Sequence, residues 1–262
     1  MKHPETSPSS PAFTRIELAV VLAVLALLAA LALPSLATSR NRSEQITCLN
    51  NLRQIGLALR VWGNDHNDQV PWRTPWCEGG LMMGSLASPT CGSDYPPQSG
   101  GGTPINWGAW INNPFIHWMW ISNDLAQPRV LACPSDDAAR VARDWSTSPA
   151  GGFLNANFRN NAVSYFIGLD VNFRPDLTRM VVAGDRNMNS NAYPVRCSAG
   201  VSLAAAVTAY PLTIRWVDAI HRDSGNLLLL DGSAYPATTP MLREVMHILD
   251  DNGQLHFLYP LR

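Results

Sequence analysis

The sequence carries little charge and no excess of basic residues. Only 15 % of its 262 residues are Asp, Glu, Lys or Arg, and the formal net charge is -1. A protein that binds nucleic acid through the phosphates needs a positively charged surface. The composition therefore argues against nucleic acid as a partner. Gly, Pro, Asn and Ser take the place of the charged residues, which indicates long loops.

Several motifs of enzymes and metal sites are also missing. There is no Gly-x-x-x-x-Gly-Lys loop for a nucleotide phosphate and no Gly-x-Ser-x-Gly nucleophile elbow. No two cysteines have the Cys-x-x-Cys spacing of zinc and thiol redox sites. We therefore expect a protein that is not an enzyme and that acts through binding or assembly.

The five cysteines are spread along the chain. If the folded part lies outside the cytoplasm, disulfides are expected. Cys77 and Cys91 bracket a Gly-rich stretch and form the favoured pair, and Cys133 with Cys197 is the second candidate. Cys48 would then remain unpaired, as a small buried apolar side chain on a helix.

Apolar sequence is concentrated near the amino terminus. From Ile16 to Leu33 every residue is apolar except Glu17. The run reaches the length of about 18 residues that a membrane-spanning helix needs, and no A-x-A cleavage site of a signal peptide follows it. We expect a retained membrane helix over about residues 16–36. A carboxylate at the edge of a membrane helix is usually functional. The first turn of a helix also favours a negative charge. The position of Glu17 alone therefore fits both a functional role and a purely structural one.

A second apolar pattern, with spacings of three and four residues, consists of Cys48, Leu52, Ile55, Leu59 and Trp62. This is the period of one face of a helix. One long helix is therefore predicted over residues 13–62, apolar on all sides at first and on one side later. It is expected to end near Gly63 and to pack its apolar face on a sheet.

The remaining residues, 63–262, are predicted to form a head of class α+β. Short apolar runs predict strands over residues 163–167, 179–183 and 212–217. Two further runs flank Asp231-Gly232 and predict a hairpin with a type I′ turn, and residues 241–249 predict a short helix. The expected architecture is a long helix packed on a mostly antiparallel sheet with long loops.

The residues Ala12-Phe13-Thr14-Arg15-Ile16-Glu17-Leu18 precede the apolar run, and Pro34 follows it. Together they resemble the cleavage and methylation signature of type IV prepilins and type II secretion pseudopilins. The resemblance implies a leader over residues 1–12, cut by prepilin peptidase between Ala12 and Phe13, and methylation of Phe13. Ala12 stands where the family usually has Gly, and Arg15 where it usually has an apolar residue.

The same resemblance implies roles for Glu17 and Pro34 in assembly. Glu17 becomes the fifth residue of the mature chain, where the family's carboxylate neutralises the amino terminus of a neighbouring subunit. Such a pair would set the axial register of a filament, because an unpaired charge among packed apolar helices is costly. Pro34 falls where these helices commonly carry a mild kink.

Three further segments resemble a large group of bacterial pseudopilin-like proteins that is common in planctomycete-type bacteria. They are Cys48 to Leu59, the tetrapeptide Cys133 to Asp136, and His221 followed after nine residues by Asp231-Gly232. The resemblance implies no reaction for this last motif. A catalytic or metal-binding pair of His221 and Asp231 is conceivable, but turn geometry explains Asp231 and Gly232, and His221 would bond the backbone.

Two clusters of oxygen-bearing residues suit Ca²⁺, a cation that prefers such ligands. One is Asp65, Asn67 and Asp68 at the predicted helix end. The other alternates like the start of a calcium loop but lacks its Gly and its closing Glu, and consists of Asp185, Asn187, Asn189 and Asn191. The first cluster therefore remains as the metal hypothesis, and no other cofactor is expected.

Four tryptophans lie close together in the sequence: Trp107, Trp110, Trp118 and Trp120. Two interpretations of this cluster are open. Burial in a loop folded over the sheet is favoured, and a platform for glycan or protein is the alternative. His66 and His117 are expected on surface loops.

The favoured function is a pseudopilin-like subunit that assembles through its amino-terminal helix into a pilus or secretion pseudopilus. Its expected partners are prepilin peptidase, other pilin or pseudopilin subunits and the membrane. It would span the inner membrane once with its head in the periplasm, and reach a filament or the cell surface after assembly. The alternative is a membrane-anchored extracellular binding module that uses the Trp-rich loops.

Overall fold

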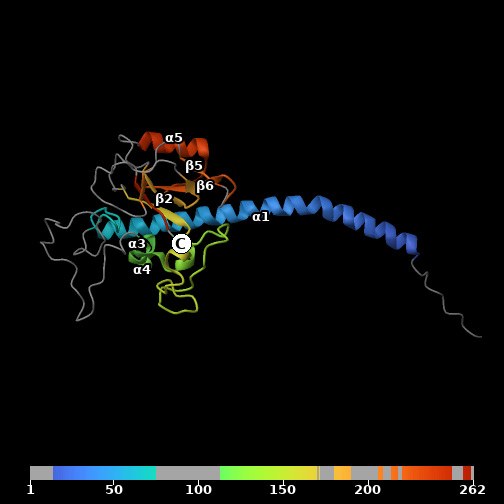
Figure 1. Cartoon of the computed structure of the whole chain (residues 1–262), viewed down its shortest axis with the longest axis horizontal. Coiled ribbons are helices and arrows are strands. Elements are labelled where there is room, and N and C mark those ends of the chain that lie inside the picture. The colour runs from blue at the N-terminus through green and yellow to red at the C-terminus, as the bar shows by residue number, and fades with distance from the viewer. Residues whose placement is uncertain are drawn as a thin grey trace, which may run out of the picture. The chain divides into compact units, whose positions relative to one another are not determined.

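A single helix, α1 (Arg15–Asp65), forms the amino-terminal part of the chain (Figure 1). The computed structural model describes residues 14–74, 113–169, 171, 180–189, 206–208, 214–217, 220–249 and 256–260. Internal contacts divide the chain into two compact units, Met1–Ser43 and Glu44–Arg262. The carboxyl-terminal half of α1 therefore belongs to the same unit as the sheet.

The predicted long helix is present, and its two parts differ as the apolar pattern indicates. The side chains from Ile16 to Leu33 are all exposed. Further along, a stripe of one face is buried in a core that it shares with the sheet: Cys48, Leu52, Ile55, Ala58 and Leu59. The helix continues through Pro34.

The main sheet has six strands in the order β4-β8-β1-β2-β6-β7. These strands are β4 (Ala206–Thr208), β8 (His256–Leu258), β1 (Tyr165–Gly168), β2 (Val181–Asp185), β6 (Ser224–Leu229) and β7 (Ala234–Thr238). Every neighbouring pair is antiparallel. A separate two-stranded sheet pairs β3 (Met188–Asn189) with β5 (Arg215–Trp216).

The α+β class and the mostly antiparallel sheet are thus confirmed. Each predicted strand exists with its limits shifted by one to three residues, and the predicted short helix is α5 (Thr239–Leu249). The strands β3, β4 and β8 were not predicted. The last two are only three residues long, too short to show an alternating pattern.

Both faces of the sheet carry buried side chains. Successive side chains of a strand point to opposite faces, so Leu228 faces the core that contains α1, whereas Leu227 faces a second core under α5. Figure 1 shows α1 and α5 on opposite sides of the sheet. Each face contributes apolar burial worth roughly 25 cal/mol per Å². The packing explains why successive residues are apolar in β1 and in the Leu227–Leu229 part of β6.

Short helices and turns complete the core beside α1. They are α3 (Pro114–Trp120), α4 (Ser122–Leu125), and the 3₁₀ helices η2 (Pro128–Leu131) and η3 (Arg159–Ala162). Phe115, Trp118 and Leu131 from these elements are buried in the same cluster as the stripe of α1.

Two glycines allow close approaches or unusual backbone geometry. A Cβ atom at Gly56 would lie 2.9 Å from Leu228 Cδ1, so glycine lets α1 approach β6 closely. Gly232 has a φ of 86° and is the last residue of a turn that its own N–H closes by donating to the Leu229 carbonyl.

The predicted hairpin between β6 and β7 is present, but the predicted type I′ turn is wrong. That turn requires positive φ at both central residues, and Asp231 is not among the described residues with positive φ. The turn spans Leu229 to Gly232 instead, and only its last residue needs the left-handed region.

Candidate functional site

The first turn of α1 contains a capping box. Glu17 Oε2 accepts hydrogen bonds from the backbone N–H and the hydroxyl of Thr14, at 2.8 and 2.9 Å. In return, the Glu17 N–H donates to Thr14 Oγ1 at 3.2 Å. This reciprocal arrangement satisfies N–H groups that a helix start leaves without partners. Glu17 therefore has a local role, which the spacing Thr-x-x-Glu could have indicated.

The surface that follows this cap is apolar. Arg15–Leu33 is a helical stretch of 19 residues, long and apolar enough to cross a membrane, and none of it is buried. Glu17 is its single carboxylate. The predicted processing residues Ala12 and Phe13 lie outside the described residues, as does the side chain of Pro34.

A disulfide joins Cys48 of α1 to Cys133, which follows η2, with their Cα atoms 5.1 Å apart. The predicted pairing of Cys133 with Cys197 is therefore wrong, and so is the expectation of an unpaired Cys48. The reason is tertiary: the segment after η2 packs on the buried face of α1, where Asn51 Nδ2 donates to the Ala132 carbonyl. Cys77, Cys91 and Cys197 lie outside the described residues.

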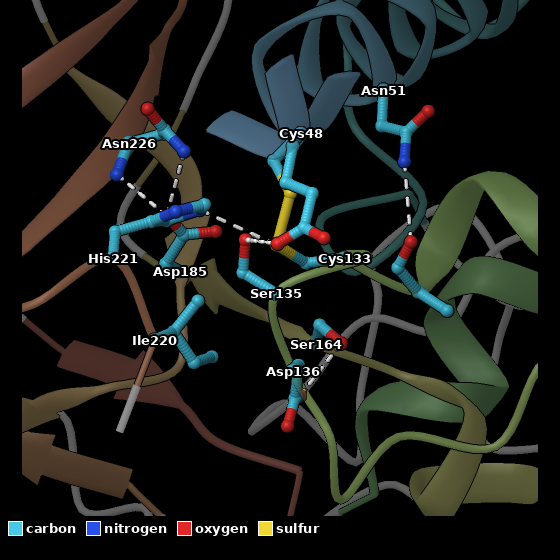
Figure 2. Close-up of a disulfide and its surroundings, with 12 residues drawn as sticks. Cys48, Asn51, Cys133, Ser135, Asp136, Ser164, Asp185, Ile220, His221 and Asn226 are labelled. Atoms are coloured by element: carbon cyan, nitrogen blue, oxygen red, sulfur yellow. Dashed lines mark hydrogen bonds and ion pairs between the residues drawn. A yellow bond between two sulfur atoms is a disulfide. The ribbon is translucent and has the colours of Figure 1, made fainter. Parts of the chain in front are cut away.

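The ring of His221 lies against this disulfide (Figure 2). Its Nε2 atom is 3.3 Å from Cys133 Sγ and 3.4 Å from Asp185 Oδ2. The backbone directs it there, because His221, Arg222 and Asp223 all have positive φ, of 53°, 49° and 54°. The expectation was that His221 bonds the backbone, whereas the contacts of its Nε2 atom are with a sulfur and a carboxyl group.

Asp185, at the end of β2, is completely buried. Its Oδ2 accepts hydrogen bonds from the backbone N–H and the side-chain amide of Asn226, at 2.7 and 2.8 Å. Its Oδ1 has no hydrogen-bond partner in the part of the chain that the structure describes. A buried polar atom without a partner is costly, so this oxygen marks a place where a further ligand or water would be stabilising.

Burial shifts the pKa values of both groups in opposite directions. It raises the pKa of Asp185 to about 7 and lowers the pKa of His221 to about 4, because the interior disfavours the charged form of each. Between these values the imidazole and the carboxyl group are both uncharged. Their contact at 3.4 Å is therefore a polar contact of neutral groups and not an ion pair.

The tetrapeptide Cys133 to Asp136 is anchored at several atoms. Ser135 Oγ donates to Glu44 Oε2 of α1 at 3.2 Å. Asp136 accepts two hydrogen bonds from the Arg186 guanidinium, at 2.6 and 2.7 Å, and one from Ser164 Oγ at 2.7 Å. The segment thus links α1 through Cys133 and Ser135 to the sheet through Asp136.

Asp231 does not approach His221 in this arrangement. Its Oδ1 accepts hydrogen bonds from the N–H and the hydroxyl of Ser233, at 2.8 and 2.6 Å, and its side chain is exposed. The carboxyl group beside His221 is Asp185, which the sequence did not indicate as its neighbour. The three segments that carry the second resemblance therefore divide into two places: Cys48, Cys133 and His221 converge on the disulfide, and Asp231 shapes the hairpin.

The candidate calcium residues have structural explanations. Asp65, Asn67 and Asp68 are exposed where α1 ends, and the last two have φ of 53° and 56°, a region that Asn and Asp tolerate well. Asn187 Nδ2 donates to the carbonyls of three residues: Val217, Ile220 and Ser224. Calcium binding at Asp65, Asn67 and Asp68 remains a prediction.

The described tryptophans belong largely to the core. Trp118 is completely buried and meets Trp72 edge to face with ring centroids 6.2 Å apart, whereas Trp107 and Trp110 lie outside the described residues. His117 is also completely buried, so its predicted place on the surface is wrong. It lies in α3, between two residues that pack inward.

Comparison of the chain with protein-family models finds no matching family. The comparisons with curated proteins and with solved structures find no match either. Function is therefore inferred from the residues and contacts described above.

Proposed function

We propose that the chain is a pseudopilin-like structural subunit. In this proposal, prepilin peptidase removes residues 1–12, the methylated Phe13 becomes the amino terminus, and α1 packs with the helices of other subunits in a pilus or secretion pseudopilus. The observation that carries the proposal is the exposed apolar surface Ile16–Leu33 with one carboxylate, Glu17, in its first turn.

An apolar helical surface of this length needs an apolar environment, because its exposure to water is unfavourable. Lipid provides that environment before assembly, since a helix satisfies its own backbone hydrogen bonds in the bilayer. The helices of neighbouring subunits would provide it in a filament. The same surface would thus be covered both in the membrane, before assembly, and in the filament, as the life cycle of a pilin requires.

The carboxylate of Glu17 is the feature that a simple membrane anchor does not need. The capping box gives Oε2 two hydrogen bonds from the neutral donors of Thr14, but it does not balance the negative charge. A charge among packed apolar helices is stable only with a partner of opposite sign. The amino terminus of a neighbouring subunit would be that partner and would fix the axial register.

The head is consistent with a location outside the cytoplasm. Disulfides form and persist in oxidising compartments such as the periplasm, and Cys48 and Cys133 are joined by one. We therefore propose a single inner-membrane span with the head in the periplasm. The alternative of a binding module on Trp-rich loops has less support, because Trp72 and Trp118 are buried.

Mass spectrometry of the amino terminus, on the protein extracted from its native membrane, tests this proposal. A chain that begins with N-methyl-Phe13 is the expected result. A chain that retains Met1, or one cut beyond Leu33, would overturn the processing on which the proposal depends. The binding-module alternative would then become the leading hypothesis.

A further inference from the structure

Three residues with metal-binding side chains meet at one point of the head. Cys48 comes from α1, Cys133 from the segment after η2, and His221 from the turn before β6. Their two Sγ atoms and the His Nε2 atom all lie within 4.8 Å of one another. Among the described residues, no other group of three or more His, Cys, Asp or Glu side chains is brought together in this way.

We propose that reduction of the Cys48–Cys133 disulfide converts this cluster into a site for one Zn²⁺ ion, bound by Cys48, Cys133 and His221. This inference does not rest on the proposed function, which places the head in a compartment where the disulfide form persists. The disulfide would then be the oxidised form of a metal site that exists wherever thiol reductants keep the two sulfurs reduced.

One of the ligand distances is already close to that of tetrahedral zinc. With Zn–S of about 2.3 Å and Zn–N of about 2.05 Å, a nitrogen and a sulfur ligand lie about 3.6 Å apart and two sulfur ligands about 3.8 Å apart. His221 Nε2 is 3.3 Å from Cys133 Sγ. The sulfur atoms are about 2.05 Å apart in a disulfide. The Cys48 Sγ atom also lies within 4.8 Å of His221 Nε2. Zinc binding therefore requires that the two sulfurs separate.

The chemistry of the three groups also suits zinc. Zinc binds thiolate sulfur and the neutral imidazole nitrogen of histidine, and the cluster offers two sulfurs and one such nitrogen. Two thiolates balance the charge of Zn²⁺, so the site as a whole carries no net charge. A buried site without net charge avoids the desolvation cost of an isolated ion.

Asp185 lies beside the proposed ligand His221. Its Oδ2 is 3.4 Å from His221 Nε2, and its buried Oδ1 has no partner among the described residues. A sulfur-rich site with three protein ligands keeps one position for water, and this oxygen can hydrogen-bond that water. The partnerless Oδ1 is thus a second observation, separate from the cysteines, that indicates a ligand here.

The reduction step can be made with a water-soluble phosphine. The disulfide accepts two electrons and two protons and becomes two thiols, and the phosphine becomes a phosphine oxide whose oxygen comes from water. Zinc binding then displaces the two thiol protons. The phosphine and its oxide are removed before the titration, under anaerobic conditions, so that zinc is the only added ligand.

The test is a zinc titration of the reduced full-length chain in detergent micelles, in competition with a chromophoric chelator. We expect one Zn²⁺ per chain after reduction and none at this site in the oxidised chain. His221→Gln should weaken binding by at least about tenfold, the effect that loss of even an outer-shell partner has on metal affinity. His66→Gln is the matched control, because His66 stacks on Trp62 at the end of α1, and it should bind zinc like the wild type.

Three outcomes would overturn the inference. They are equal zinc affinity of the reduced wild type and His221→Gln, equal binding by the oxidised and reduced chains, and a reduced chain that is unfolded and that zinc does not refold. Oxidised His221→Gln is first compared with the wild type by near-ultraviolet circular dichroism. If that variant does not fold, the zinc ligands of the reduced wild type are determined by X-ray absorption at the zinc edge. Two sulfur ligands and an imidazole would support the proposed site, and any other set of protein ligands would overturn it.

Discussion

The two halves of α1 differ in how far their apolar side chains are exposed. Leu31, in the first half, is 69 % exposed, whereas Leu52 in the second half is completely buried. In the first half apolar residues occupy every side of the helix, and in the second they form one stripe. The width of an apolar surface thus indicates what covers it: a stripe fits one sheet, and a surface on all sides fits lipid or a ring of neighbouring helices.

The two halves also differ in how they hold polar groups. Glu17 is exposed, and among the described residues its hydrogen-bond partner is Thr14 of the same first turn. Asn51, in the second half, donates to the carbonyl of Ala132, which is distant in sequence. The hydrogen bonds of Glu17 are therefore local, and the hydrogen bond of Asn51 is tertiary. We expect substitutions in the first half to affect assembly and those in the second to affect the stability of the head.

The largest effect is expected for Glu17→Gln. Glutamine can replace glutamate in a capping box, so the helix start is retained while the negative charge is lost. We expect the variant to enter the membrane normally and to form no filaments, as measured by membrane fractionation and by electron microscopy of sheared material.

Thr14→Ala is the matched control for Glu17→Gln. It removes the cap, at a cost of about 1 kcal/mol, but keeps the charge, so assembly should persist. If Glu17→Gln assembles normally and Thr14→Ala does not, the carboxylate acts only as part of the cap. The axial-register role would then have to be abandoned.

A pair of leucines in the second half tests the stripe. Leu52 is completely buried and Leu57 is 66 % exposed, so the same chemical change can be made on each side of the helix. Leu52→Ala should lower the free energy of unfolding by about 2–5 kcal/mol, and Leu57→Ala by less than about 0.5 kcal/mol. Urea unfolding of the full chain in detergent, followed by tryptophan fluorescence, measures both. Equal losses would show that the two faces are covered alike.

The pH dependence of stability tests the buried pair. The pKa of Asp185 rises from 3.8 to about 7 on folding, so its burial costs more stability as pH increases through that range. The pKa of His221 falls from 6.5 to about 4, so its burial costs more stability as pH decreases from 6.5 to 4. Between about pH 4 and 6.5 the two slopes oppose each other, and the wild type should show little net dependence on pH from this pair.

Single substitutions should reveal the two slopes separately. His221→Gln leaves Asp185, and stability should fall as pH rises from about 4 to 7, by about 1 kcal/mol per pH unit. Asp185→Asn leaves His221, and stability should rise from about pH 4 to 6.5 with a similar slope. Urea midpoints at several pH values measure this. Slopes of the same sign in both variants would contradict the opposite pKa shifts.

Periodicity was sufficient to predict the parts of the fold that depend on local sequence. The spacing of Leu52, Ile55 and Leu59 indicates the buried face of α1, and apolar runs locate β1, β2 and the β6–β7 hairpin. The three-residue strands β4 and β8 have no such signal. They exist because they pair with each other, and because β8 also pairs with β1.

The contacts of the candidate site could not be predicted because they join distant segments. Cys48 and Cys133 are separated by 85 residues, and Cys133 and His221 by 88. The local sequence does not distinguish a disulfide between Cys133 and Cys48 from one between Cys133 and Cys197. The pairing depends on the tertiary packing of the Cys133 segment on α1. The capping box of Thr14 and Glu17 is different, because its spacing is local and was available in the sequence.

The smallest effect is expected at the other end of the motif that contains His221. Asp231 is exposed and bonds only Ser233 among the described residues, so Asp231→Ala should cost about 0.5–1.5 kcal/mol, the net value of a typical hydrogen bond. It should leave zinc binding by the reduced chain unchanged, whereas His221→Gln weakens it. Differential scanning calorimetry and the zinc titration measure the two properties. If Asp231→Ala weakened zinc binding as much as His221→Gln does, the two residues would form one site after all, and the hairpin would be part of it.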